Sequence, residues 1–156
     1  MVFNSVRLLA VISVVLCLIP AGAHFFELAN KMSLSTAEYM TTQKIYAGWS
    51  FFGVTIIATI VFTLVHTLMV RAQPTAFLLS LSALLLLGAT QVIFWTFTYP
   101  MNAATNNWTV TPQDFEAARL QWEYSHAVNA VLTFVALVTI TLSAFTYTRD
   151  SGFEAD

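Results

Sequence analysis

The chain has few charged residues for its length. Only 9% of its 156 residues are charged, whereas 58% are hydrophobic and the mean hydropathy is +0.73. About a quarter of the residues in an ordinary soluble domain are charged, so this chain lacks the side chains that would cover a water-facing surface. Intrinsic disorder is excluded as well, because disordered segments are poor in apolar residues. The composition is that of an integral membrane protein.

Basic residues and cysteine are also scarce. Six lysines and arginines are outnumbered by eight acidic residues, and without a basic stripe we expect no nucleic-acid partner. The single cysteine, Cys17, excludes an internal disulfide framework. The length fits one domain over residues 1–156.

Four long stretches contain no formal charge. Each is long enough for a spanning helix of about 20 apolar residues, and the apolar runs are continuous, which favours helices over a β-barrel. We therefore predict an all-α, integral membrane four-helix bundle with spans at about 6–23, 45–70, 74–99 and 124–148. The first span also resembles a secretion signal; we interpret it as a retained helix, with cleavage as the alternative.

Two capping patterns precede the second and fourth spans. Ser35 and Glu38 form a capping box, and Thr111 is followed by a proline suited to a first helical turn. Both patterns lie about ten residues before their spans, so these two helices are predicted to begin outside the bilayer on one side. Pro100 is predicted to end the third helix.

Four spans place both termini on the same side of the membrane. Arg7, Arg71 and Arg149 lie close to the spans on that side, which favours cytoplasmic termini by the positive-inside rule. The other side carries as many basic residues, so the charge difference is small. We expect a bacterial inner-membrane protein surrounded by membrane lipid.

Two short motifs place ionisable residues near one end of the spans. His24 and Glu27 lie three residues apart at the end of the first helix, and Glu123 and His126 lie three apart at the start of the fourth. The two helices run in opposite directions, so if they pack together both histidines lie level at one depth and both glutamates at another. These four side chains are candidate ligands of a mononuclear transition metal. Glu-x-x-His is also the spacing of di-iron carboxylate sites, but the other spans supply no acidic residue.

Other interpretations of these motifs remain open. The histidines could be the axial ligands of a heme b walled by Trp49, Phe94, Trp95 and Trp122, or the site could work without a cofactor. A histidine and a glutamate at a membrane interface are also ordinary structural placements. His66, near the opposite end, is interpreted as an interfacial histidine.

Further residues are candidates for the same site. Glu27, Glu123 and Asn129 are candidate catalytic residues, since Asn129 lies one turn from His126 on the same helix face. The candidate substrate-binding residues are Trp49, Gln91, Trp95, Tyr99 and Trp122. The alternative is that the two amides form interhelical hydrogen bonds and that the aromatic rings form an interfacial belt.

Two blocks of the sequence resemble a known family. GAHFFELANKMSLS and WTFTYPMNAATNNWTVTPQDFE, the latter followed by RLQWEYSHAVNA, resemble a bacterial membrane family of unknown function grouped with the anthrone-oxygenase-like proteins. The resemblance implies a four-helix membrane bundle and an oxygenase acting on polycyclic aromatic substrates such as anthrones. It also implies that no metal or flavin is needed, and it matches Asn102, Trp108, Arg119 and Trp122 to a family pattern of Asn, Trp and Arg.

The sequence thus supports two main hypotheses. The first is a membrane redox enzyme acting on a lipophilic aromatic or quinone-like small molecule, with a mononuclear metal, a heme b or no cofactor. The second is a non-catalytic bundle that serves as an accessory subunit of a membrane complex, a homo-oligomer or a binder of a lipophilic ligand or heme. A transporter is less favoured, because the ionisable groups gather at one end instead of lining a path.

Overall fold

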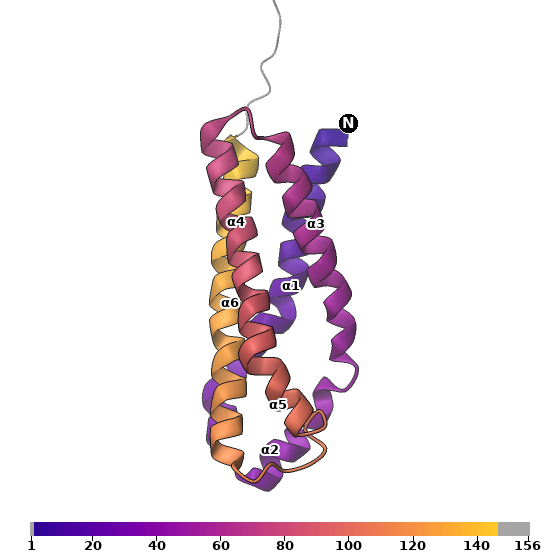
Figure 1. The fold of residues 1–156 in the computed structure, drawn as a ribbon, viewed down its shortest axis with the longest axis vertical. Helices are drawn as coiled ribbons and strands as arrows, with labels where there is room; N and C mark the ends of the chain where they lie inside the picture. Colours follow the sequence, from indigo (N-terminus) through magenta and orange to yellow (C-terminus); the bar gives the residue numbers. More distant parts are fainter. Residues whose placement is uncertain (1, 147–156) are drawn as a thin grey trace, which may run out of the picture.

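The protein is an all-α bundle whose computed structural model describes residues 2–146 (Figure 1). Within that range there is no strand, and four helical segments are long and apolar enough to cross a membrane. They are Val2–Met32, Trp49–Met69, Pro74–Ala104 and Phe115–Thr146. The predicted all-α, four-helix membrane architecture is confirmed.

The four long helices form a closed ring. Helices α1 (Val2–Met32) and α4 (Pro74–Ile93) each pack against both α3 (Gly53–Met69) and α6 (Phe115–Thr146). The beginning of α1 and the α3–α4 turn lie at one end of the bundle, and the short helix α2 (Thr36–Thr42) lies at the other (Figure 1). We call the end that carries α2 the polar end.

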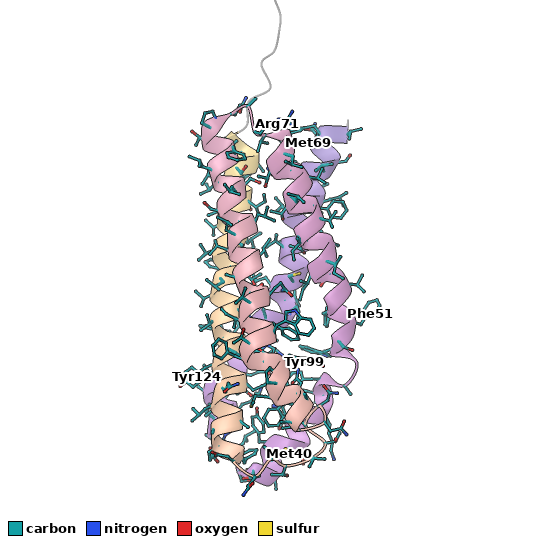
Figure 2. The ribbon with its side chains drawn as sticks, in the orientation of Figure 1. Met40, Phe51, Met69, Arg71, Tyr99 and Tyr124 are labelled. Atoms are coloured by element: carbon teal, nitrogen blue, oxygen red, sulfur yellow. The ribbon has the colours of Figure 1, made fainter. Side chains whose placement is uncertain are left out.

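The core along most of the bundle is made of small and medium-sized side chains. The buried cluster at its centre consists of Ala10, Val14, Ala83, Leu87, Ala136 and Ile140. Small residues let helix backbones approach closely, which is how helices associate in lipid. Large apolar side chains instead face outward, as Figure 2 shows for Phe51, and they supply the surface that contacts lipid.

The second predicted helix is interrupted, contrary to our expectation of one helix running from outside into the bilayer. The capping box is confirmed, since Ser35 and Glu38 bond each other's backbone at the start of α2. The chain then makes two short 3-10 helices, η1 (Gln43–Tyr46) and η2 (Trp49–Phe52), before α3 begins. Between them Gly48 has φ +85°, a left-handed conformation that favours glycine and ends the helix.

The fourth helix begins before the predicted span at residue 124, but later than the predicted cap at Thr111. The side chain of Asp114 accepts a hydrogen bond from the backbone of Ala117, so Asp114 caps α6 and Thr111 does not. The predicted end of this span at residue 148, and Arg149 with it, lie outside the described residues.

The third helix does not end at Pro100. The π-helical turn η3 (Phe94–Thr98) follows α4, and α5 (Tyr99–Ala104) continues with Pro100 in its first turn. A proline is tolerated there because the first amides of a helix have no intrahelical acceptor. The extra residue in a π turn changes the direction of the side chains that follow it.

The first helix is longer than predicted. It continues nine residues beyond residue 23 to Met32, and 31 residues at about 1.5 Å each give about 47 Å. The hydrocarbon core of a bilayer is only about 30 Å thick. The extra turns carry His24, Glu27 and Lys31 to the polar end.

Candidate functional site: a polar cluster closed by aromatic rings

A buried ion pair joins the first and last helices at the polar end. Lys31 Nζ on α1 lies 2.7 Å from Glu123 Oε1 on α6, and the two side chains are only 3% and 0% exposed. The hydroxyl of Tyr39 on α2 donates a hydrogen bond of 2.8 Å to the same carboxylate oxygen. Buried charges are stable only when they are paired and hydrogen-bonded, so this contact fixes α1, α2 and α6 together.

A second carboxylate extends this network towards the surface. Lys31 Nζ donates to the hydroxyl of Tyr46 at 3.2 Å, and Tyr46 in turn donates to Glu27. Lys31 also lies 3.9 Å from Glu27, whose side chain is 38% exposed. The hydrogen-bonded chain therefore runs from the fully buried Glu123 through Lys31 and Tyr46 to the partly exposed Glu27.

Aromatic rings surround the ammonium group. Lys31 Nζ lies 4.8 Å from the centroid of the Tyr46 ring and 4.8 Å from that of Trp122. Such distances allow cation–π attraction, which is strongest where water is excluded. Burial, together with the neighbouring carboxylate of Glu123, raises the pKa of Tyr39 well above its usual range, so that phenol remains a hydrogen-bond donor.

The two histidines of the mirrored motifs lie in direct contact. The rings of His24 and His126 are stacked, with centroids 4.2 Å apart and an angle of 25° between their planes. The ring of Trp122 lies against both, and Tyr46 and Trp49 lie against His24. The first and fourth spans do pack together, which was the condition on which we expected the two histidines to lie level.

Several polar atoms of this region are buried without a partner. They include Nδ1 of His24, Nε2 of His126, Oε2 of Glu123 and Oδ1 of Asn129. Most buried polar atoms in proteins are hydrogen-bonded, so each exception needs an explanation. We use the name polar cluster for His24, Glu27, Lys31, Tyr39, Tyr46, Glu123, His126 and Asn129.

The carboxylates of the proposed metal centre are engaged elsewhere. Glu123 is bound by Lys31 and Tyr39, and Glu27 by Tyr46. Within residues 2–146 no group of three or more histidine, cysteine or acidic side chains is arranged to hold a metal ion. The histidines retain free lone pairs and fit a ligand role, whereas the glutamates as placed do not. The four-ligand metal centre stays a prediction.

Heme fits the histidine geometry poorly. Axial histidines lie on opposite faces of a porphyrin, whereas the rings of His24 and His126 are in van der Waals contact. The helices would have to separate to admit the macrocycle.

A layer of aromatic side chains closes the polar end below the cluster. Tyr39, Trp108, Phe115 and Trp122 form a buried group there. The indole N–H of Trp122 donates to Oδ1 of Asn102 at 2.7 Å, which ties α6 to α5. This layer covers the side of the polar cluster opposite the bundle core, while Glu27 remains partly exposed.

The candidate substrate-binding residues on the third helix, Gln91, Trp95 and Tyr99, have no contact with the polar cluster. The side chain of Trp95 is 60% exposed and stacks on Tyr99 on the outer surface of the bundle. Gln91 donates only to its neighbour Thr90. The π turn at Phe94–Thr98 lies between Gln91 and Tyr99 and changes the direction of the side chains that follow it.

His66 lies at the other end of the bundle, where it is completely buried. Its Nε2 lies 3.2 Å from Oγ of Ser143. Ser143 donates to the backbone oxygen of Ala76 at 2.6 Å. His66 therefore links α3, α4 and α6 and has no contact with the polar cluster.

Three members of the cluster were missed from the sequence: Lys31, Tyr39 and Tyr46. Lys31 was treated only as a basic residue of the outer side. Its spacing carried a signal, because residues 24, 27 and 31 recur at i, i+3 and i+7 on one helix face. No local signal links the two tyrosines to carboxylates on other helices.

Comparison with known proteins found no match. No family model, no curated protein and no solved structure matches the chain. The fold and the cluster define the protein as an integral membrane four-helix bundle with a buried charged site at one end. Its function is inferred from that site.

Proposed function

We propose that the protein is an oxygenase-like membrane enzyme that acts on a lipophilic aromatic or quinone-like molecule at the polar cluster. The observation that carries this proposal is the contact between His24 and His126, each with a buried ring nitrogen that has no partner. A positioned imidazole is the commonest general base in enzymes. Aromatic walls from Tyr46, Trp49 and Trp122 suit a flat aromatic substrate.

The chemistry begins with removal of a proton from an acidic C–H or O–H of the substrate by one of the two imidazoles. The ammonium group of Lys31 stabilises the resulting anion, because charges act strongly where water is excluded. The anion then reacts with O₂. For a methylene group between aromatic rings, one oxygen atom becomes the new carbonyl and the other leaves as water with the two hydrogens of the methylene.

Glu27 and Glu123 are already bound by other side chains. This favours an enzyme that works without a cofactor over one that uses a metal ion or a heme. A carboxylate that balances the charge of Lys31 is not free to bind a metal ion. In this version Glu27 and Glu123 orient Lys31 and carry protons, and neither is a metal ligand.

An apolar groove on the outside of the bundle, between α6 and the end of α4, suits a lipophilic molecule. It has a volume of about 370 Å³ and is lined by Ile93, Phe97, Gln121, Tyr124, Ser125 and Val128. Tyr124, at its edge, points away from the bundle in Figure 2.

The proposal is tested by oxygen consumption with anthrone as the probe, using the full-length protein in lipid nanodiscs. We expect His24→Gln and His126→Gln each to slow the reaction about a hundredfold, the usual range for loss of a general base. His66→Gln is the matched control, because this histidine lies at the other end. Equal rates in all three variants and the parent would refute the proposal.

Metal analysis and an optical spectrum of the same protein distinguish an enzyme with a metal ion, one with a heme and one without a cofactor. A stoichiometric metal, or a Soret band, that disappears in the His24→Ala/His126→Ala double variant would favour the metal or heme version. Retained oxygen consumption after exhaustive chelation is expected for the version without a cofactor.

A non-catalytic role is the second candidate. The buried pair of Lys31 and Glu123 fixes three helices together, as a structural contact would. In that role the protein is an accessory subunit, a homo-oligomer or a binder of a lipophilic ligand. It would show bound lipid and no substrate-dependent oxygen consumption.

Our proposed location is a bacterial inner membrane with cytoplasmic termini.

A further inference from the structure

The loop between α5 and α6 crosses the polar end of the bundle (Figure 1). Of residues 106–114 only Trp108 is buried, with 5% of its surface exposed. Its ring packs at a steep angle against the rings of Tyr39 and Trp122, with centroids 5.2 and 5.5 Å away. Trp122 in turn lies against both histidines of the polar cluster. One side chain of this loop therefore covers the cluster from outside.

Trp108 occupies this position in an unfavourable conformation. Asn106, Asn107 and Trp108 have φ angles of +46°, +53° and +61°, in the left-handed region. Asparagine tolerates this region, but a bulky residue such as tryptophan rarely adopts it. The indole N–H of Trp108 is also buried without a hydrogen-bond partner, which costs further free energy. Strained residues of this kind persist only where the surrounding structure imposes them, and here that structure is the packing of one ring.

The loop has few attachments to the rest of the bundle. The backbone N–H groups of residues 108–110 donate to Thr105, and that of Asn107 donates to the backbone oxygen of Asn102. Among the described residues, the hydrogen bonds of 106–110 therefore reach no further than Asn102 on α5. Once its aromatic contact is released, the loop can move without breaking a hydrogen bond to α2 or α6.

We propose that residues 105–110 form a gate over the polar cluster, closed by the ring of Trp108 and opened by displacement of the loop while the four long helices stay folded. The strained backbone and the unpaired indole N–H both lower the free energy needed to open it. The open gate exposes Tyr39 and Trp122 to the aqueous phase. This proposal concerns access alone and does not depend on the proposed function.

The first test is hydrogen exchange of the full-length parent protein in nanodiscs. The amides of residues 108–110 exchange only when their bonds to Thr105 open. After correction for intrinsic rates, we expect them to exchange at least about a hundredfold faster than amides in the middle of α6, because gate opening is a local event that unfolds no helix.

The second test measures access beneath the gate. Phe115 belongs to the buried layer and packs on Tyr39, so Phe115→Cys in a Cys17→Ser background reports the opening to a water-soluble maleimide. Trp108→Ala removes the side chain that closes the gate, and we expect it to speed labelling at least about tenfold.

A pair of valine variants tests the role of backbone strain. Asn107→Val places a β-branched side chain in the left-handed region, which destabilises the closed loop. We expect it to raise both the exchange of the gate amides and the labelling rate severalfold. Gln113→Val is the matched control, since Gln113 is an exposed residue of the same loop without a positive φ. Both rates should stay unchanged in the control.

The gate is refuted if the amides of 108–110 exchange no faster than those of α6, if Trp108→Ala leaves labelling unchanged, or if the two valine variants behave alike. The exchange measurements need no introduced cysteine, so they decide the question even if Phe115→Cys does not fold. A gate that behaves as expected, in a protein that consumes no oxygen, would refute the proposed enzyme and leave the gate intact.

Discussion

Lys31 and Glu123 form the contact on which the polar end depends most. Both side chains are almost completely buried, so the Glu123 carboxylate depends on Lys31 and on the hydroxyl of Tyr39. The ammonium group of Lys31 is stabilised in turn by Glu123, by the hydroxyl of Tyr46 and by the neighbouring aromatic rings. Removing one member of such a pair leaves the other buried and uncompensated, which usually costs more than the pair itself contributes.

Glu123→Gln is therefore expected to lower the free energy of unfolding by about 3–5 kcal/mol, seen as a lower midpoint of thermal unfolding in detergent. Replacing both members, as Lys31→Met with Glu123→Leu, should recover most of this loss, because no unpaired charge remains. The matched control is Glu116→Gln, which breaks the ion pair with Arg119. Glu116 is 63% exposed, so we expect a cost of about 1 kcal/mol or less. Equal losses for Glu123→Gln and Glu116→Gln would contradict the buried pair.

At the scale of elements, the short helix α2 depends on its capping box. Glu38 accepts hydrogen bonds from the backbone and the hydroxyl of Ser35, and these bonds hold the pKa of Glu38 below its ordinary value of 4.5. A carboxylate whose pKa is lowered on folding stabilises the folded state above that ordinary value. The stabilisation is lost as the pH falls through the lowered pKa.

Hydrogen exchange of the backbone amides at the start of α2 should therefore be constant near neutral pH and accelerate, beyond the intrinsic pH effect, only below about pH 4.5. Glu38→Gln keeps an acceptor for Ser35 but cannot ionise, so the acid-dependent part should disappear. If the variant and the parent show the same acid response, another group is responsible.

Gly48 determines where the second spanning helix begins. Its φ of +85° is a conformation that costs an L-residue about 1–2 kcal/mol, although no atom would touch an added methyl group. Gly48→Ala should therefore destabilise the protein by about 1 kcal/mol. Gly88→Ala, inside α4 and also free of contacts, should stabilise it by about 0.5–1 kcal/mol. Thermal unfolding of the two variants should show shifts of opposite sign, and shifts of the same sign would exclude backbone strain as the cause.

For the whole molecule, the number of spanning helices could be predicted because each span is a continuous apolar run. The antiparallel direction and the spacing predicted that His24 and His126 lie level if α1 and α6 pack together, but not that the two helices do pack. The partner of Lys31 could not be predicted either, because the contact depends on the rotation of α1 and α6 about their own axes. The outward position of Trp95 could not be predicted, because a π turn leaves no clear pattern in a sequence.

The orientation of the protein in the membrane can be tested at two residues, Ser33 and Arg71, which lie at opposite ends of the bundle. Arg71 is labelled in Figure 2. In a Cys17→Ser background, a membrane-impermeant thiol reagent applied to intact bacteria should label Ser33→Cys and leave Arg71→Cys unlabelled until the cells are opened. The cysteine-free background is the control. The reverse pattern would place the polar end, and with it the proposed site, on the cytoplasmic side.

The long-range pairing of Lys31 with Glu123 also bears on how the protein is made. Glu123 is synthesised about ninety residues after Lys31, which at about 5–20 residues per second is a delay of about 5–20 seconds. During this interval Lys31 has only Glu27 of its own helix nearby and lacks its buried partner Glu123. A long lysine side chain can extend to the headgroup layer and remain hydrated there. The Lys31 ammonium group can therefore move from water into the protein interior only after α6 has been synthesised. Packing of α6 is then the step that completes assembly.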